Sequence, residues 1–160
     1  MAKDEAGAGR PEGDPLDFHL RIPNRLEMVR ALRALLAGTL EGRGVDEEDA
    51  QEIQLVVSEI VNNSIEHVRG RGPGGYHEVE ILFGVDGDRV VGRVRDEGEG
   101  GIQQKDFDRA APPDVGTDRG RGLFLIQAYV DELSVTPLRG VGTEIRFAKR
   151  VRLRAGERKP

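Results

Sequence analysis

Residues 52–68 read EIQLVVSEIVNNSIEHV, and Glu59, Asn63 and His67 follow one another in this stretch at intervals of four. Because each helical residue turns the chain by about 100°, a spacing of four moves a side chain by only about 40° around the axis. The three polar residues are therefore expected to form one rib, either rimming a cleft or belonging to the solvated side of the helix. The apolar residues recur at helical spacing and predict a broad buried face: Ile53, Val56, Val57, Ile60, Val61, Ile65 and Val68.

The composition favours one domain with a protein or small-molecule partner. The chain has 160 residues, a net charge of −5 and a pI near 5.3, which argues against binding nucleic acid through phosphate neutralisation. It has no cysteine and three histidines, which argues against disulfides, a thiolate nucleophile or a structural zinc site. No apolar run approaches the roughly 20 residues of a membrane span, and the N-terminus lacks a secretory signal, so we expect a cytoplasmic protein.

The N-terminal half predicts a tail, a strand and two helices. Residues 1–16 are rich in Gly, Pro, Ala and charge and are expected to be disordered. Residues 18–22 alternate as a half-buried strand. Leucines at helical spacing predict a helix over Leu26–Leu40, with Asn24 as its N-cap, and Asp46 is expected to cap the next helix.

The C-terminal half predicts two hairpins separated by a long loop and a helix. The loop is a polar segment of roughly 18 residues that ends at Gly120 and has no clear core face, which is typical of a lid or binding loop. The helix is expected to start directly after Gly122. This order predicts a two-layer α+β sandwich over residues 17–149, with helices on one face of a mixed, mostly antiparallel sheet, and a basic tail over residues 150–160. The expected strands cover residues 79–85, 90–94, 133–136 and 143–148.

Asp96, Gly98 and Gly100 form D-x-G-x-G at the end of a predicted strand. A carboxylate there can accept a hydrogen bond from a ligand amine, and the glycines let the backbone approach that ligand. The alternative is an ordinary Asp-Gly turn.

Gly120, Arg121 and Gly122 form a second short motif, at a predicted helix start. Unpaired N–H groups and the positive end of the helix dipole favour an anion there, and Arg119 and Arg121 add positive charge. The alternative is a helix start that tolerates glycine. The P-loop and the dinucleotide-binding glycine fingerprint are both absent, so any nucleotide site must be of another type.

The motifs in their order resemble the GHKL superfamily of ATPases, which includes DNA gyrase B, heat-shock chaperones and the catalytic domain of histidine kinases. The order is E-x-x-x-N-x-x-x-H on a helix, D-x-G-x-G after a strand, a lid, G-x-G opening a helix, and Gly142-Thr143 on a late strand. Within the superfamily the chain looks most similar to the bacterial anti-sigma-factor serine kinases, over roughly residues 17–149. The resemblance implies a Bergerat-type ATP-binding fold.

The resemblance also implies a role for each motif residue. Asn63 would supply its side-chain oxygen to a Mg²⁺ bridging the ATP phosphates, and Glu59 would be the general base for a serine hydroxyl or for water. Asp96 would receive the adenine amino group, with support from Thr143. His67 would have a supporting role at most. Gly98 and Gly100 would shape the adenine pocket and hinge the lid. Gly120 and Gly122 would present backbone N–H groups to the phosphates.

At the level of function, the resemblance implies an ATP-dependent protein serine kinase that acts as a homodimer. Such a kinase binds a sigma factor, phosphorylates a STAS-like antagonist and controls transcription by exchange of partners. A nucleotide-binding regulator without kinase activity stays open as the alternative, because its ATP-contact residues would look the same. The detached catalytic domain of a histidine kinase is disfavoured, since His19 falls in a predicted strand, a poor place for a phosphoacceptor.

Overall fold

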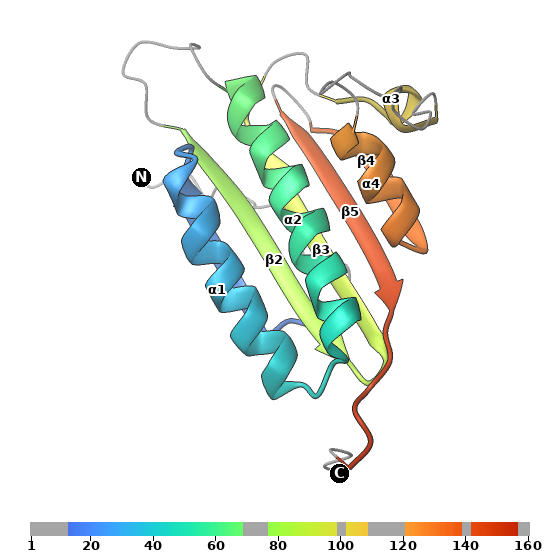
Figure 1. Ribbon diagram of the computed structural model, residues 1–160. Helices are drawn as coiled ribbons and strands as arrows, with labels where there is room; N and C mark the ends of the chain where they lie inside the picture. The colour runs from blue at the N-terminus through green and yellow to red at the C-terminus, as the bar shows by residue number, and fades with distance from the viewer. Residues whose placement is uncertain (1–12, 69–76, 99–101, 109–120, 139–141, 157–160) are drawn as a thin grey trace.

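A computed structural model describes residues 13–68, 77–98, 102–108, 121–138 and 142–156. They form two layers, with helices on one face of a five-stranded sheet (Figure 1). The strands lie in the order β1-β2-β3-β5-β4, and each neighbouring pair is antiparallel. The predicted α+β sandwich with a mostly antiparallel sheet is confirmed. In chain order the elements are β1 (Phe18–Pro23), α1 (Glu27–Gly42), α2 (Glu47–Val68), β2 (Glu78–Asp86), β3 (Arg89–Asp96), α3 (Gln104–Asp108), α4 (Arg121–Tyr129), β4 (Glu132–Pro137) and β5 (Thr143–Arg150).

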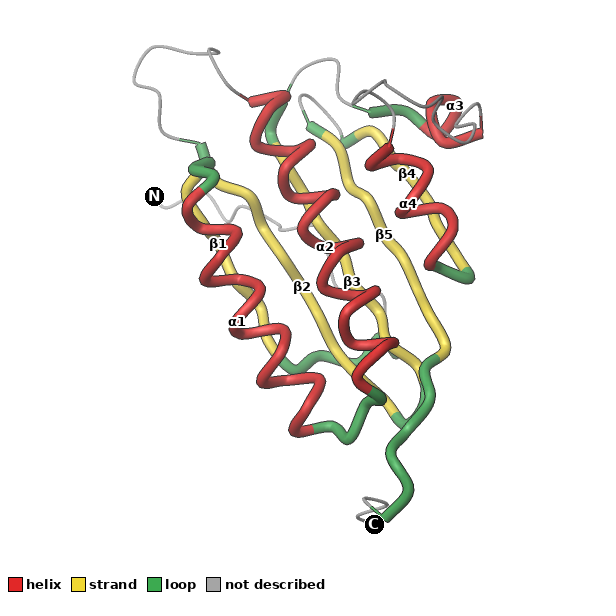
Figure 2. Tube along the Cα trace, viewed as in Figure 1, coloured by secondary structure: helices red, strands yellow, loops and turns green. Residues whose placement is uncertain are grey.

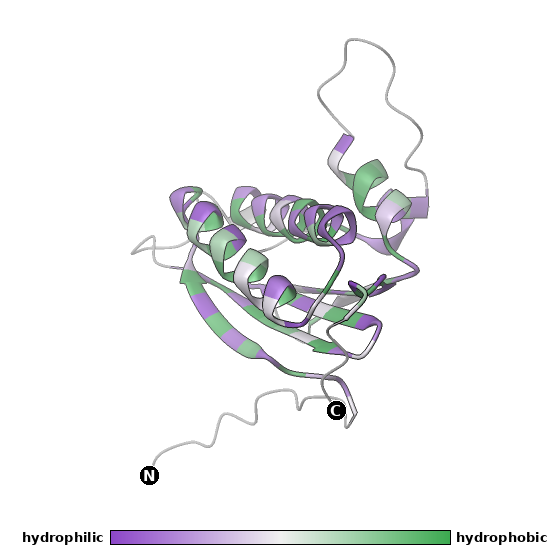
Figure 3. Cartoon of the chain, turned by 60° about the horizontal axis from the view of Figure 1, so that its bottom comes forward, coloured by the Kyte–Doolittle hydropathy of each residue, from purple (hydrophilic) through white to green (hydrophobic). Residues whose placement is uncertain are grey.

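The core lies between the sheet and the helices α1 and α2, as the edge-on view in Figure 3 shows. The predicted apolar face of α2 is buried from Ile53 to Ile65. Each such side chain contributes roughly 1.5–3 kcal/mol on burial, so this face fixes the helix on the sheet. Among the described helices, none is both long enough and apolar enough to cross a membrane.

The two predicted helix caps have different outcomes. Asp46 caps α2 as expected, because its carboxylate accepts a hydrogen bond from the Glu48 N–H at 3.1 Å. Asn24 does not cap α1: the N-cap position is Leu26, with no side-chain cap bond. The Asn24 N–H instead donates to the His77 carbonyl at 3.0 Å. Asn24 therefore continues the contact between β1 and the start of β2, and the helix begins later.

The segment predicted to lack a core face has one in its first part. Residues 104–108 form α3, and the Phe107 side chain is only 1% exposed within the core. The Gln104 side chain accepts a hydrogen bond from the Val135 N–H of β4 at 3.1 Å. Residues 109–120 lie outside the described part. One buried phenylalanine among charged residues gives no periodic signal, which is why the sequence did not predict this helix.

Both predicted tails are partly attached to the fold. Residues 1–12 and 157–160 lie outside the described part, but Asp14 bonds to two arginines of the sheet. After β5, Arg152 pairs with Asp49 at 3.1 Å, and Leu153 forms a bridge with Val45. Asp14, Arg152 and Leu153 are therefore joined to the domain by these contacts, and the domain bounds stay a prediction. The charged side chains that made these segments look like tails are the ones that attach them.

Candidate functional site

β3 ends and β5 begins at the same end of the sheet (Figure 2). Asp96, the last residue of β3, and Thr143, the first residue of β5, face one another there. They are direct partners in the β3–β5 pairing, and they are only 5% and 6% exposed. The structure therefore brings together the two residues to which the resemblance assigned adenine recognition, although they are far apart in sequence.

The backbone on both sides of this pair is tightly shaped. The Gly98 N–H donates to the Asp96 carboxylate at 3.0 Å, which turns the chain directly after β3. Gly142 has a φ of 126°, and a Cβ there would lie well inside 3.0 Å of the Asp96 carbonyl oxygen. A residue other than glycine would therefore separate the ends of β3 and β5.

Glu59 and Asn63 lie one turn apart on α2 and face the start of α4. A Cβ at Gly122 would lie 2.6 Å from Glu59 Oε2 and 3.9 Å from Asn63 Nδ2. A side chain at position 122 would displace the carboxylate end of Glu59, so the glycine leaves room for this carboxylate beside the first turn of α4. The predicted general base, the predicted metal ligand and the second glycine of the G-x-G motif are thus adjacent in space.

The Asn63 amide nitrogen is buried and has no hydrogen-bond partner within the described residues. An unsatisfied buried polar group typically costs about 1–3 kcal/mol, so a ligand that pairs with it gains that energy. The amide can present either its nitrogen or its oxygen by a flip about its last bond. Among the described residues, no cluster of three His, Cys, Asp or Glu side chains could hold a metal alone. With the amide flipped, the side-chain oxygen would take the unpaired position, and an oxygen there would fit Mg²⁺, which binds through one or two protein oxygens together with phosphates and water.

Glu59 is in an environment that favours its protonated form. Burial raises the pKa of its carboxyl, and the negative charge of Glu66, two turns further along α2, raises this pKa as well. A carboxylate that is poorly solvated holds a proton more readily, which is the property that a general base near neutral pH needs.

The other predicted site residues are placed only in part. Arg121 is the first residue of α4 and is exposed, two positions before the predicted helix start. Gly98 lies at the turn after β3. Outside the described residues lie Gly100, Arg119, Gly120 and the side chain of His67.

The sequence did not reveal the backbone geometry of Gly142 or the effect of Glu66 on Glu59. Gly142 preceded the predicted contact residue Thr143, but its positive φ leaves no mark in a sequence. Glu66 was not among the predicted site residues. The spacing of seven between Glu59 and Glu66 is a helical period and was the available signal.

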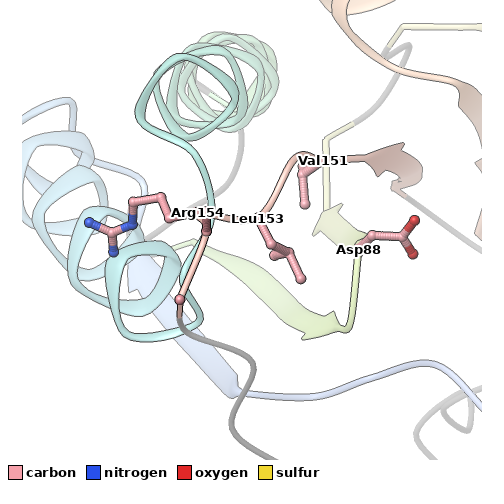
Figure 4. A pocket seen from close by; sticks show the side chains of 6 residues that line it. Asp88, Val151, Leu153 and Arg154 are labelled. Atoms are coloured by element: carbon pink, nitrogen blue, oxygen red, sulfur yellow. The ribbon is translucent and has the colours of Figure 1, made fainter.

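A pocket of about 590 Å³ lies at the opposite end of the sheet and contains none of these residues (Figure 4). It lies between the turn after β2 and the chain that follows β5. Its lining residues are Asp88, Val151, Leu153, Arg154, Ala155 and Gly156.

The chain is similar in sequence to proteins of a known family. The histidine kinase-like ATPase domain family matches residues 22–149. Serine-protein kinase RsbW of Bacillus subtilis is 30% identical over 130 residues, which cover 78% of this chain and 80% of that protein. Serine-protein kinase RsbW of Staphylococcus epidermidis is 27% identical over 149 residues, 88% of this chain and 93% of that protein.

Two solved structures share the fold. One contains the RsbU and RsbW domains of Rv1364c from Mycobacterium tuberculosis, with a TM-score of 0.61 and 22% identity over 84% of this chain; the match spans 31% of that longer chain. The other is the SiaB–SiaC complex from Pseudomonas aeruginosa, with a TM-score of 0.60 and 13% identity, covering 86% of this chain and 91% of that chain. The resemblance inferred from the motifs is confirmed, and the chain belongs to the histidine kinase-like ATPase domain family.

Proposed function

We propose that this protein is an ATP-dependent serine kinase that binds a sigma factor and phosphorylates a STAS-like antagonist. The observation that carries the proposal is the contact of Gly122 with Glu59 and Asn63, which places a carboxylate of raised pKa at a helix start suited to phosphate. Two kinds of relative support it: proteins named serine-protein kinases, and a fold neighbour solved in complex with a second protein. Partner exchange, a homodimer and a cytoplasmic location are part of the same proposal.

The two ends of the nucleotide would be bound by different parts of the site. Asp96 would accept a hydrogen bond from the adenine amino group, and Thr143 beside it would support that contact. The N–H groups at the start of α4 would bind phosphate oxygens. Asn63 would hold Mg²⁺, which would neutralise charge on the phosphates. Glu59 would take the proton from a serine hydroxyl of the antagonist, so that the oxygen can attack the terminal phosphorus while the bond from this phosphorus to ADP breaks and ADP leaves.

The decisive experiment is incubation with γ-labelled ATP and purified STAS-like proteins encoded beside this chain. We expect label on a serine of one of them. A protein that binds Mg·ATP yet leaves every candidate unlabelled would be a regulatory binding module, and the kinase proposal would then be wrong.

Replacing Asn63 with Ala is expected to remove most of the Mg²⁺-dependent part of the ATP affinity. The loss of one charge-assisted contact corresponds to about 10- to 100-fold in Kd. Calorimetric titration with ATP, with and without Mg²⁺, measures this difference. Asn62→Ala is the matched control, because it removes the same side chain from the neighbouring position. An equal loss of affinity in both titrations would show that Asn63 does not bind the metal.

Replacing Glu66 with Gln is expected to move the acid limb of the pH–activity profile to lower pH. The deprotonated form of Glu59 is the base, so activity is lost as the pH falls through the pKa of Glu59. Because Glu66 raises that pKa, removing its charge lowers the pKa and extends activity to more acidic conditions. The shift should shrink with added salt, which screens exposed charges.

The measurement is transfer rate against pH at low ionic strength. Glu47→Gln, at the far end of α2, serves as the control and should leave the profile in place. A profile unchanged by Glu66→Gln would mean that Glu59 does not limit the reaction at acidic pH.

A further inference from the structure

Residues 13–17, which we call the strap, cross the outer face of the sheet, the face turned away from α1 and α2. Arg93 marks this face, since its neighbour Val94 points into the core. At one end of the strap, Asp17 is held firmly: its N–H donates to the Phe83 carbonyl and its carboxylate accepts from the Val85 N–H, both at 2.8 Å. At the other end, Asp14 meets two arginines.

The two arginines form a site for a carboxylate. Arg93 of β3 and Arg146 of β5 are direct partners across the strands, and like charges placed opposite one another destabilise a sheet. Asp14 lies between them: Arg146 donates to both of its carboxylate oxygens, at 3.0 and 3.3 Å, and Arg93 donates at 3.1 Å. This forked geometry suits a planar carboxylate, the group that it holds here.

The neighbouring acidic residues do not replace Asp14. Glu144 is 3.9 Å from Arg93 and is hydrogen-bonded to Arg95, while Glu132 is 3.7 Å from Arg146. Arg93 is nevertheless only 4% exposed. Without Asp14, the two arginines would lack their closest counter-ion.

The sheet also leaves room for the backbone of the strap next to the Asp14 carboxylate, at Gly84. A Cβ at Gly84 of β2 would lie well inside 3.0 Å of the Pro15 backbone, so the strap crosses the sheet where a side chain is missing. The space left beneath the strap is about 10 Å³, at the lower limit of what one water needs. Between its ends the strap adds little hydrophobic attachment, since Leu16 is 41% exposed.

We propose that the surface formed by Gly84, Arg93 and Arg146 is a docking site for an extended acidic segment of a partner protein, which the strap occupies in competition. The surface recognises one carboxylate and an adjacent stretch of extended backbone. An extended acidic segment of a partner protein has both features. The strap is covalently attached to β1, so its effective concentration is high, and a partner segment must displace Asp14 to bind. Because Asp17 is anchored separately, Asp14 can leave while β1 stays paired.

The test uses the full chain and a fluorescein-labelled peptide with the sequence of residues 10–18, RPEGDPLDF, measured by fluorescence anisotropy. Wild-type protein should bind it weakly, because the strap is in place. Asp14→Asn should release the strap and bind the peptide at least about tenfold more tightly, the effect of one charge-assisted contact. The control is the same peptide with Asn in place of Asp14, which should not show this gain.

Two second-site variants locate the binding. Adding Arg146→Gln to Asp14→Asn should abolish the gain by removing the fork, and adding Gly84→Ala should abolish it by obstructing the backbone. Circular dichroism checks that each variant is folded, and Arg146 is chosen over Arg93 because it is less buried. The proposal is overturned if Asp14→Asn binds the peptide no better than wild type, or if the gain survives Arg146→Gln. It is also overturned if light scattering shows a dimer that Asp14→Asn dissociates, since a second copy would then supply the strap.

Discussion

Replacement of Glu59 by Gln should reduce phosphoryl transfer by about 10²- to 10⁴-fold, the usual contribution of a general base, while Mg·ATP binding stays close to wild type. Glutamine keeps the shape that contacts Gly122 and removes only the charge and the ability to accept a proton. The turnover with saturating STAS-like substrate should therefore fall, while the calorimetric affinity for Mg·ATP should stay close to the wild-type value.

The control for this prediction is Gln51→Ala, which changes an exposed residue on the same helix whose side chain donates a hydrogen bond to Glu47. It should leave both quantities unchanged. If the Glu59→Gln protein transfers phosphate at the wild-type rate, Glu59 is not the general base and another group must have that role.

The second large effect is expected from Gly142→Ala, which should abolish detectable ATP binding and destabilise the fold by about 2–4 kcal/mol. The loss has two sources: a φ of 126°, which residues with a side chain rarely adopt, and a Cβ in contact with the Asp96 carbonyl. The ends of β3 and β5 must separate to relieve that contact, and the Asp96–Thr143 pair would open with them.

Gly87→Ala provides the matched control. Gly87 also has a positive φ, 55°, but a Cβ there meets nothing within 4 Å, and it lies at the opposite end of the sheet. It should lower the free energy of unfolding in urea by a smaller amount and leave the ATP affinity intact. If Gly142→Ala binds ATP as well as Gly87→Ala does, the Gly142 contact does not shape the nucleotide site.

The periodic spacing of apolar residues was enough to predict the main helices and strands of this fold. The apolar stripe of α2 and the strands predicted from alternation are present, because burial on one face imposes a period on the sequence. The prediction that Asn24 caps α1 was wrong because its backbone N–H bonds to His77, a residue far away in the sequence that a local pattern does not include. The short helix α3 was not predicted because only one of its side chains, Phe107, is buried, and one residue gives no periodic pattern.

The site could be predicted only through the resemblance. Periodicity places Glu59 and Asn63 on one rib, but nothing local states that Gly122 lies against them. The strap shows the same limit. Asp14 stands in a polar segment 79 residues from Arg93, and only the folded sheet shows that the two charges pair.

The place of β5 in the sheet has a consequence for synthesis on the ribosome. β5 is the last of the described strands in chain order, yet it lies inside the sheet, between β3 and β4. A nascent chain that ends before Thr143 can pair β1, β2 and β3, but β4 has no strand to pair with and Asp96 lacks its partner. Because such long-range pairings form late, the ability to bind nucleotide should arise only when almost the whole domain has left the ribosome. In such a protein, ATP would be retained only by chains whose synthesis and folding have been completed.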